Sequence, residues 1–316
     1  MLPKPLDPLS ILPWEKTFKL DVAEADLPGV SIVIPIYNAG GFLEKTLRSL
    51  ICNDLSGVDL ILMDANSTDN TREIVEHYRD IFAITVFEKD EGQSDAINKG
   101  YAQAEQPILY WLNGDDLILP NALVAVRRAF RDNPGSEVVV GNAYMTEKDL
   151  TPIRHFVFSE EKLTFKYLLD YAAHHLVQPS VFFSRTAWDT VGPLKVEQHY
   201  AMDADLFLGM AAKFKFRYIP VDIGYSVYHE ECKTRGKRAE SITELALVQA
   251  SHGGFTESRK TLDILVNMFN EAEKQIESAT PPTAVEVTGL KLKLKMLQDQ
   301  VEKNKLLLLR EDMELI

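Results

Sequence analysis

Along residues 30–140, short continuous apolar runs alternate with segments that have helical periodicity. Short apolar runs of strand length are each followed by a segment in which apolar residues recur every three or four positions, as on one face of a helix. The runs that we interpret as strands are Val30–Ile36, Val58–Met63, Phe82–Phe87, Pro107–Leu112 and Glu137–Val140. The segments that we interpret as helices are Phe42–Ile51, residues 70–79 (capped by Asn70 or Ser67), Ser94–Ala104 and Pro120–Arg131. Strands that alternate with helices of these lengths predict an α/β fold with a mostly parallel, doubly wound sheet.

The alternation is looser between residues 150 and 235. Here the pattern predicts helices at Phe165–Tyr171 and Asp203–Phe214, and strands at Val181–Phe183 and Phe216–Tyr228. We expect this half to complete a binding site begun by the first half and to face a second substrate.

The two ends of the chain have different patterns. Five prolines within residues 1–28 exclude a long helix and predict an extended arm that lies on the domain. Residues 242–272 have helical periodicity, and Pro281-Pro282 marks a boundary after them. The predicted divisions are an arm at 1–28, a central domain at 29–238 with halves at 29–145 and 146–238, a helical extension at 239–280 and a final helix at 283–316.

The final helix has the pattern of a short coiled coil. Apolar residues between 290 and 315 alternate at spacings of four and three, with the polar Asn304 within the seam. The helix either joins copies of the chain into a homo-oligomer through residues 290–315 or packs on its own domain. Lys291, Lys293 and Lys295 between leucines indicate a third alternative, a helix lying on a membrane surface, which nearby acidic residues weaken.

Composition narrows the class of partner. The 316 residues are 46% apolar, which is enough for a substantial core, and their formal net charge is −13. An acidic chain argues against nucleic acid as the main partner, although it leaves room for a nucleotide held through a metal. Cys52 and Cys232 have no metal-ligand spacing, and neither a signal-peptide core nor an apolar run of membrane-spanning length is present. These features predict a cytoplasmic protein.

Polar residues gather where the predicted strands end. The first strand runs into Pro35–Asn38, the second ends at Asp64, and the fourth ends in the segment Trp111–Asp116 with two adjacent carboxylates. Each acidic residue by itself is best explained as a helix cap or turn residue. Several of them at successive strand ends predict a cleft at one edge of the sheet. Because adjacent carboxylates repel, a divalent metal that carries a phosphate ester is one candidate for the compensating cation.

The common nucleotide and hydrolase motifs are missing. No GxGxxG follows the first strand, no GxxxxGK[ST] is present, and no GxSxG occurs. A nucleotide would therefore have to be bound by residues outside these motifs.

From Val30 to about Arg235 the chain resembles the family 2 glycosyltransferases of the bacterial polysaccharide and lipopolysaccharide type, which have the GT-A fold. Five blocks carry the resemblance in the family's order. They are Ser31–Asn38, Met63–Thr71, Gly92–Gly100 with Trp111–Asp116, Tyr200–Leu208 and Tyr228–Thr234.

The resemblance implies a nucleotide-sugar site with a role for each matching residue. A Mg²⁺ or Mn²⁺ ion on Asp115, with Asp116 beside it and His229 completing the site, would neutralise the diphosphate. Asn113 stands where many members have the first Asp of Asp-x-Asp, so one acidic contact is missing. Ala65 likewise stands where the family has a second Asp. The remaining donor-site residues implied by the resemblance are Pro35, Tyr37, Asp64 and Asp95 for the base and ribose, Gln93 beside them, and Lys233 and Arg235 for the diphosphate.

Helical spacing and the resemblance together indicate the catalytic base. Leu206, Phe207 and Met210 fall on one stripe of the predicted helix with Asp203 in line, while Asp205 points the opposite way. From spacing alone, Asp203 is either a helix cap or a carboxylate directed into the cleft. The resemblance implies the second role.

The resemblance implies an inverting transfer of a sugar from a UDP- or GDP-linked donor to a hydroxyl of a carbohydrate or lipid-linked glycan. It implies a place in surface polysaccharide or lipopolysaccharide assembly, in the cytoplasm or peripheral to the inner membrane. We expect acceptor contacts from the second half of the domain, where His174, His175 and Gln178, just before Pro179-Ser180, are candidates. One alternative is a sugar nucleotidyltransferase, but Asn38–Gly41 lacks the cations that its loop would need. The other is a non-catalytic scaffold acting through the coiled coil.

Overall fold

The computed structural model describes residues 3–230, 232 and 237–278, together with positions 292, 295, 296 and 299. The described residues form two compact units. The first contains the chain up to Leu168 together with His174–His229, and the second contains Leu169–Ala173 and the residues from Glu230 on.

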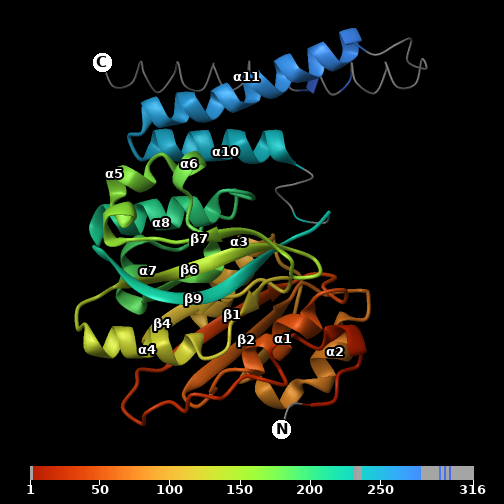
Figure 1. Ribbon diagram of the computed structural model, residues 1–316, viewed down its shortest axis with the longest axis vertical. Helices are drawn as coiled ribbons and strands as arrows, with labels where there is room; N and C mark the ends of the chain where they lie inside the picture. The colour runs from red at the N-terminus through yellow and green to blue at the C-terminus, as the bar shows by residue number, and fades with distance from the viewer. Residues whose placement is uncertain are drawn as a thin grey trace. The chain divides into compact units, whose positions relative to one another are not determined.

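A single mixed sheet forms the centre of the first unit (Figure 1). Its strands follow the order β3-β2-β1-β4-β8-β6-β9-β5, with β7 paired to β6. Among the described strands, β5, β7 and β8 run antiparallel to their neighbours and the others run parallel, so the predicted mostly parallel sheet is confirmed. The strands are β1 Val30–Ile36, β2 Val58–Asp64, β3 Ile84–Phe87, β4 Ile108–Trp111, β5 Leu117–Ile118, β6 Val138–Glu147, β7 Pro152–Phe156, β8 Val181–Ser184 and β9 Phe216–Tyr228.

Helices cover both faces of this sheet. Ile32 and Ile34 of β1 lie in a core with residues of α1, α2 and α4, whereas Val33 points to the other face and meets α3. A Cβ on Gly100 of α3 would lie 2.5 Å from Val33 Cγ1, so the close approach of helix and strand needs glycine. The helices are α1 Leu43–Ile51, α2 Thr71–His77, α3 Gln93–Ala102, α4 Ala122–Asp132, α5 Phe165–Leu168, α6 Tyr171–His174, α7 Arg185–Val191, α8 Met202–Lys213, α10 Arg238–Ser251 and α11 Phe255–Ser278.

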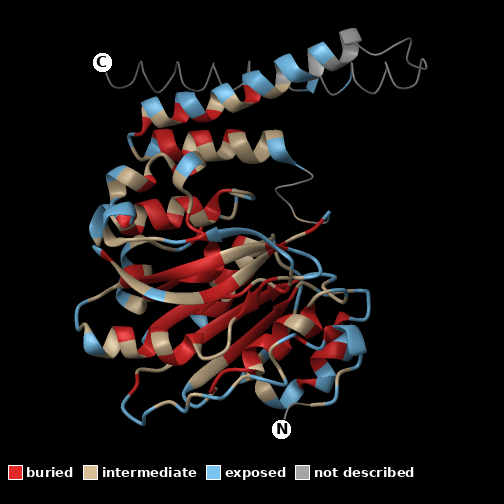
Figure 2. Cartoon of the chain, viewed as in Figure 1, coloured by how far each residue is buried: buried red, intermediate tan, exposed pale blue. Residues whose placement is uncertain are grey.

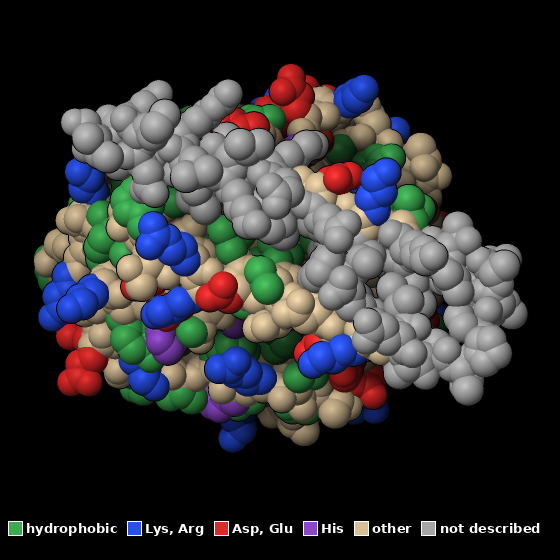
Figure 3. Space-filling view, turned by 90° about the horizontal axis from the view of Figure 1, so that it is seen from above, with side chains coloured by type: hydrophobic (Ala, Val, Ile, Leu, Met, Phe, Trp, Pro, Cys, Tyr) green, Lys and Arg blue, Asp and Glu red, His purple; other side chains and the backbone are tan. Residues whose placement is uncertain are grey.

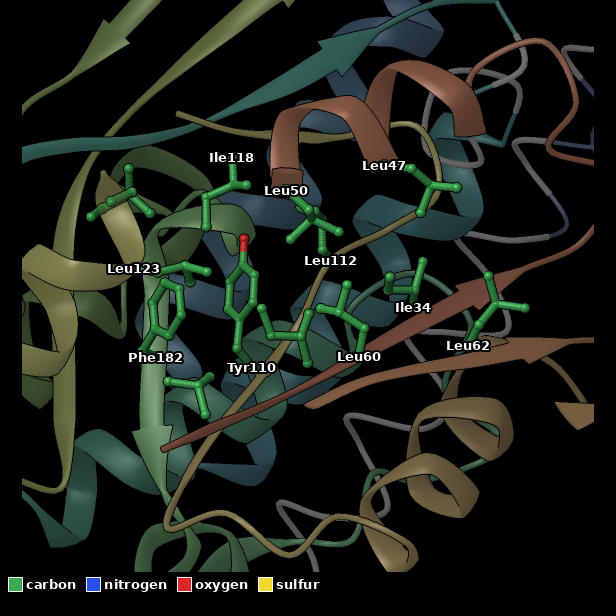
Figure 4. Close-up of a cluster of buried hydrophobic side chains, with 14 of the residues drawn as sticks. Ile34, Leu47, Leu50, Leu60, Leu62, Tyr110, Leu112, Ile118, Leu123 and Phe182 are labelled. Carbon is green, nitrogen blue, oxygen red and sulfur yellow. The ribbon is translucent and has the colours of Figure 1, made fainter. Parts of the chain in front are cut away.

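The core between the sheet and its first helix layer is apolar and closely packed. Tyr110 of β4 and Phe182 of β8 stack with ring centres 3.9 Å apart, surrounded by leucine and isoleucine side chains (Figure 4). The Tyr110 hydroxyl donates to the Pro179 carbonyl oxygen at 3.1 Å, which satisfies the polar end of the ring. Figure 2 shows the central strands β1, β4 and β8 almost wholly buried, while exposed residues lie on the arm, on β7 and on the outer sides of the helices.

Some local predictions are wrong, and each error has a physical reason. Leu117 and Ile118 form the short strand β5, which is absent from the predicted elements, because they pair with β9. The helix predicted at Pro120–Arg131 begins only after Asn121, whose φ is 65°. The helix predicted at 165–171 is two short helices, α5 and α6. The long periodic stretch at 242–272 is broken between α10 and α11 at Gly253, whose φ is 82°.

The strand β7 and the second half of β6 are absent from the predicted elements. In β7 only Phe156 is buried, so it lacks the apolar run by which the other strands are recognised. Asn70 occupies the N-cap position of α2, as predicted, but its side chain makes no capping hydrogen bond; Asp69 Oδ1 accepts the Thr71 N–H at 3.0 Å instead.

Residues 3–28 contain only one short helix, Pro8–Ser10, and are tied to the sheet domain by buried polar contacts. The Arg48 guanidinium bonds to the Glu15 carboxylate at 2.5 Å, and both side chains are almost fully buried. Glu44 of α1 accepts the N–H groups of Leu6 and Asp7. These contacts hold the arm against α1.

In the second unit, α10 and α11 pack on each other and on Leu169–Ala173. Gln249 of α10 donates to the Leu169 carbonyl oxygen at 2.9 Å and accepts from the Thr261 hydroxyl of α11 at 2.6 Å. The coiled coil predicted at 283–316 lies outside the described residues except for the helical positions Leu292, Lys295, Met296 and Asp299. No helix among the described residues combines the length and apolarity needed to cross a membrane.

Charged side chains on the face of Figure 3 are dispersed: lysine and arginine lie singly among acidic, apolar and uncharged polar groups. Outside the residues drawn in grey, that face has no continuous patch of positive or of negative charge.

Candidate active site

The ends of β1 and β2 are joined by a small polar network. Asp64, buried at the end of β2, accepts the Ser67 N–H at 3.0 Å and the Ser67 hydroxyl. Ser67 Oγ accepts the Asn38 N–H at 2.8 Å, and Asn38 Oδ1 accepts the Thr68 N–H at 2.8 Å. Asn38 and Asn66 have φ values of 49° and 62°, which asparagine tolerates. Asp64 is therefore held rigidly beneath the loop that follows β2.

The proline in β1 occupies a position where a missing N–H costs nothing. Val33 O accepts from Leu112 N on the β4 side, and Ile36 O accepts from Ala65 N on the β2 side. The backbone groups of successive strand residues point alternately to the two neighbouring strands, so those of Pro35, like those of Val33, point toward β4. Because β4 has already ended at Trp111, the missing N–H of Pro35 breaks no hydrogen bond between the strands. Tyr37 then emerges from the strand with 64% of its surface exposed, so its ring is available to a ligand.

Asp95 lies in the first turn of α3 with its carboxylate fixed. Oδ2 accepts the Glu91 N–H at 3.0 Å and pairs with Lys99 Nζ at 3.0 Å. Burial alone would raise the pKa of Asp95, but these two partners outweigh it and lower that pKa below the usual value. Asp95 is thus ionised and able to accept hydrogen bonds at neutral pH.

Asn113 is the centre of the turn after β4. Its Oδ1 accepts from Gln93 Nε2 at 2.7 Å, and its Nδ2 donates to Asp116 Oδ2 at 2.9 Å and to Gln178 Oε1 at 3.4 Å. Gln178 in turn donates to the Trp111 carbonyl oxygen at 2.8 Å. An amide can both donate and accept in this way, whereas an ionised aspartate could only accept, so the network fits asparagine at position 113.

Asp116 is directed into the protein. Its Oδ1 accepts the Val227 N–H at 3.0 Å, and Oδ2 accepts from Asn113, so both oxygens are engaged by protein donors. Burial and the neighbouring charge of Asp115 raise the pKa of Asp116 to about 8, although these hydrogen bonds oppose the shift. The geometry favours Asp116 as a positioning residue over a direct metal ligand.

Asp115 points the other way and meets His229. The pairing of β5 with β9 brings the end of β9 beside the turn, and His229 Nε2 lies 2.9 Å from Asp115 Oδ2. The side chains are 7% exposed for His229 and 35% for Asp115. The Phe42 ring stacks on the imidazole at 4.1 Å between centres. This pair therefore has a fixed orientation and an open side.

The Asp115–His229 pair fits a divalent ion. Two neighbouring ligands of an octahedral ion at about 2.1 Å lie roughly 3 Å apart, close to the separation observed here. A carboxylate oxygen and an imidazole nitrogen are both acceptable to Mn²⁺, and the oxygen is also acceptable to Mg²⁺.

Glycine is required where this turn meets β1. A Cβ on Gly114 would lie 2.7 Å from Ile36 Cγ2, and the Gly114 carbonyl oxygen accepts the Thr46 hydroxyl of α1 at 3.0 Å. The turn is therefore pressed against β1, with Asp115 next to the β1–α1 loop.

Asp203 lies at the start of α8 and is half-buried. One helical turn further on, Phe207 stacks on Trp111 with ring centres 5.8 Å apart, which directs this face of α8 to the end of β4. Asp205, by contrast, pairs with Lys195 at 2.9 Å. Asp203 thus lies on the face of α8 that packs against the end of β4, as the helical spacing predicts.

The other predicted residues separate into three groups. Gln178 joins the network at the end of β4, as described above. His174 stacks on Tyr167 and His175 packs against Phe156, so they are placed by other aromatic rings. Lys233 and Arg235 lie outside the described residues. The sequence patterns did not indicate Phe42, because an aromatic residue at a helix start has no distinctive spacing.

The described residues form a mostly parallel α/β sheet with carboxylates at the ends of β2 and β4 and an Asp–His pair beside them, the arrangement expected of the GT-A fold. The model of the glycosyl transferase family 2 matches residues 31–191, just over half of the chain. The chain belongs to that family.

Two curated relatives share part of the sequence. An uncharacterized glycosyltransferase of Rickettsia typhi is 26% identical over 242 residues, covering 72% of this chain and 71% of the relative. The putative teichuronic acid biosynthesis glycosyltransferase TuaG of Bacillus subtilis is 28% identical over 141 residues, covering 44% of this chain and 56% of TuaG. The chain therefore spans only about half the length of TuaG.

Solved structures share the fold. S. aureus TarS 1–349 in complex with UDP-GlcNAc aligns with a TM-score of 0.59 at 17% identity, over 87% of this chain and 89% of that one. The mannosyltransferase PcManGT of Pyrobaculum calidifontis, in complex with GDP-Man and Mn²⁺, aligns with a TM-score of 0.54 at 16% identity, over 92% and 90%.

Proposed function

We propose that this glycosyltransferase inverts the anomeric configuration as it moves a sugar from a UDP- or GDP-linked donor to a hydroxyl of a growing surface glycan. The observation that carries the proposal is the Asp115–His229 pair, 2.9 Å apart with an open side, at the sheet edge that also holds Asp64 and Asp95. Membership of the family supports the reaction class, and the likeness to TuaG supports polysaccharide assembly.

The donor would bind along the ends of β1, β2 and β4. The exposed Tyr37 ring and the fixed carboxylate of Asp64 would contact the base, and the ionised Asp95 would accept from ribose hydroxyls. Pro35 supports this site through the shape of β1, and Gln93 supports it through its bond to Asn113.

Asp115 and His229 would hold the divalent ion. The ion, when bound, supplies positive charge to the departing diphosphate. The solved complexes of TarS with UDP-GlcNAc and of PcManGT with GDP-Man and Mn²⁺ are consistent with this kind of site.

Asp203 would act as general base. Its carboxylate accepts the proton of the acceptor hydroxyl while that oxygen forms a bond to the anomeric carbon. The bond from the anomeric carbon to the diphosphate oxygen breaks at the same time, and its electron pair leaves with the nucleoside diphosphate. Attack from the face opposite the leaving group inverts the anomeric centre.

The test is release of nucleoside diphosphate from a panel of UDP- and GDP-sugars, with Mn²⁺, with Mg²⁺ and with EDTA. We expect one donor to turn over with metal, and Asp115→Asn to lose at least about tenfold in metal affinity while its thermal midpoint changes little. Binding of no donor and no nucleoside diphosphate under any condition would exclude the proposed reaction. Pyrophosphate release from a nucleoside triphosphate and a sugar phosphate would instead indicate a nucleotidyltransferase.

A further inference from the structure

The turn between β6 and β7 brings a lysine to the side of the candidate metal site. Lys148 Nζ lies 4.6 Å from the centre of the Phe42 ring, and the same ring stacks on His229 at 4.1 Å. His229 is the residue that contacts Asp115. Lys148 and His229 therefore both contact the Phe42 ring, which places Lys148 next to the Asp115–His229 pair.

This position depends on an unusual backbone turn. Leu150 has a φ of 70°, which is costly for a residue other than glycine or asparagine. The turn is closed by the bonds Leu150 N–H to Glu147 O at 2.9 Å and Glu147 N–H to Thr151 O at 2.8 Å. The Leu150 side chain packs against Leu12, Leu117 and Val227, so an apolar cluster holds the strained turn in place.

That apolar cluster is continuous with the site. Leu117 directly follows Asp116, and Val227 donates its N–H to the Asp116 carboxylate at 3.0 Å. The turn that carries Lys148 is therefore anchored on the strand ends that carry the metal-site residues. A rigid support of this kind is expected where a side chain must be placed accurately.

The charge of Lys148 is available to a ligand. Its side chain is exposed, and no carboxylate of the described residues lies within 4 Å of its Nζ. A partly exposed ammonium over an aromatic ring keeps its charge and its remaining donors. Since the chain has a net charge of −13, a cation without an acidic partner beside this site is notable.

We propose that Lys148 binds the diphosphate of the donor, as a leaving-group contact that nothing in the family motifs assigns. This inference rests on the proposed function and adds a residue to it. When the bond between the anomeric carbon and the phosphate oxygen breaks, that oxygen keeps the electron pair and the diphosphate gains charge. The Lys148 ammonium stabilises this charge without giving up a proton. It would share the diphosphate with the divalent ion on Asp115 and His229.

The experiment compares the affinities of UDP and UMP, and of GDP and GMP, for the full chain in Mn²⁺ by calorimetry. Lys148→Met should weaken nucleoside diphosphate binding by about tenfold and change nucleoside monophosphate binding by less than about threefold. Lys148→Arg should restore most of the diphosphate affinity, because it restores the charge. Lys16→Met is the matched control: it removes one exposed lysine of the arm and the same net charge, and should leave both affinities as in the wild type.

Two further readouts separate binding from folding. The thermal midpoint of Lys148→Met should stay close to the wild-type value, and its kcat with the donor should decrease more than its KM increases, because the charge to be stabilised grows in the transition state. Equal diphosphate affinity in wild type and Lys148→Met would overturn the role of Lys148 alone. A wild-type chain that binds no nucleoside diphosphate would overturn the proposed function as well.

Discussion

Asn113 Nδ2 donates a hydrogen bond to Asp116 Oδ2 at 2.9 Å. The same amide accepts from Gln93, so one residue ties α3 to the acidic turn after β4. Because Asp116 is buried, this donor compensates part of the cost of placing a carboxylate there. The residue that departs from the family's Asp-x-Asp pattern is therefore the one that holds the second acid of this turn in place.

Asn113→Asp should destabilise the protein more than Asn113→Ala does. An aspartate at 113 would bring a carboxylate against the Asp116 carboxylate and Gln178 Oε1, where the asparagine now donates to both. We expect a loss of about 2 kcal/mol in the free energy of unfolding at pH 8, measured by urea denaturation in EDTA. An Asn113→Asp variant as stable as the wild type would show that this amide is replaceable.

The stability of the metal-free protein should depend on the ionisation of Asp116. Its pKa is raised to about 8 from 3.8, so the folded state binds a proton more tightly than the unfolded state does. The stabilisation is fully present below pH 4 and is lost as the pH rises from 4 to 8, with a total of a few kcal/mol.

Urea denaturation between pH 4 and 9 measures this effect. Asp116→Asn cannot ionise, so the difference in unfolding free energy between wild type and variant should shift in favour of the variant as the pH rises. Taking the difference cancels the titration of other groups. A difference that stays constant over this range would mean that Asp116 has no raised pKa.

Asp203→Asn should reduce kcat and leave donor binding unchanged. The amide cannot accept the acceptor's proton, and loss of a general base costs about 10²-fold to 10⁴-fold. Asp205→Asn is the matched control two residues along α8, where the carboxylate pairs with Lys195. Steady-state kinetics and UDP or GDP titration of both variants give the comparison. If Asp205→Asn loses more activity than Asp203→Asn, the base has been assigned to the wrong residue.

The arm should contribute to stability through the buried pair of Glu15 and Arg48. Glu15→Gln removes the negative charge and one of the two oxygens that accept from the buried Arg48 guanidinium, which keeps its bonds to Tyr78 and the Pro3 carbonyl oxygen. Breaking one side of a buried pair costs about 3 kcal/mol or more. The double variant Glu15→Leu with Arg48→Met should recover much of this loss, as seen in chemical denaturation. Equal stability of Glu15→Gln and wild type would show that the arm is held by its backbone contacts alone.

The sequence by itself determined the alternation of strands and helices and the residue types at the strand ends. Long apolar runs such as Val30–Ile36 and Val58–Met63 have one stable location, the centre of a sheet covered on both faces, so their role follows from local pattern. For the same reason Asp64 and Asp115 could be expected at one edge of the sheet, and the family blocks added a role for each.

The tertiary structure decided which groups meet. Leu117–Ile118 is a strand only because β9 pairs with it, and that pairing, between residues more than a hundred positions apart, carries His229 to Asp115. Phe42 and Lys148 join the same place from two further elements, and neither has a local signal in the sequence. The sequence likewise could not show that Asp115 opens outward while Asp116 turns inward. That choice depends on hydrogen-bond donors from Asn113 and from distant Val227, which only the folded chain brings together.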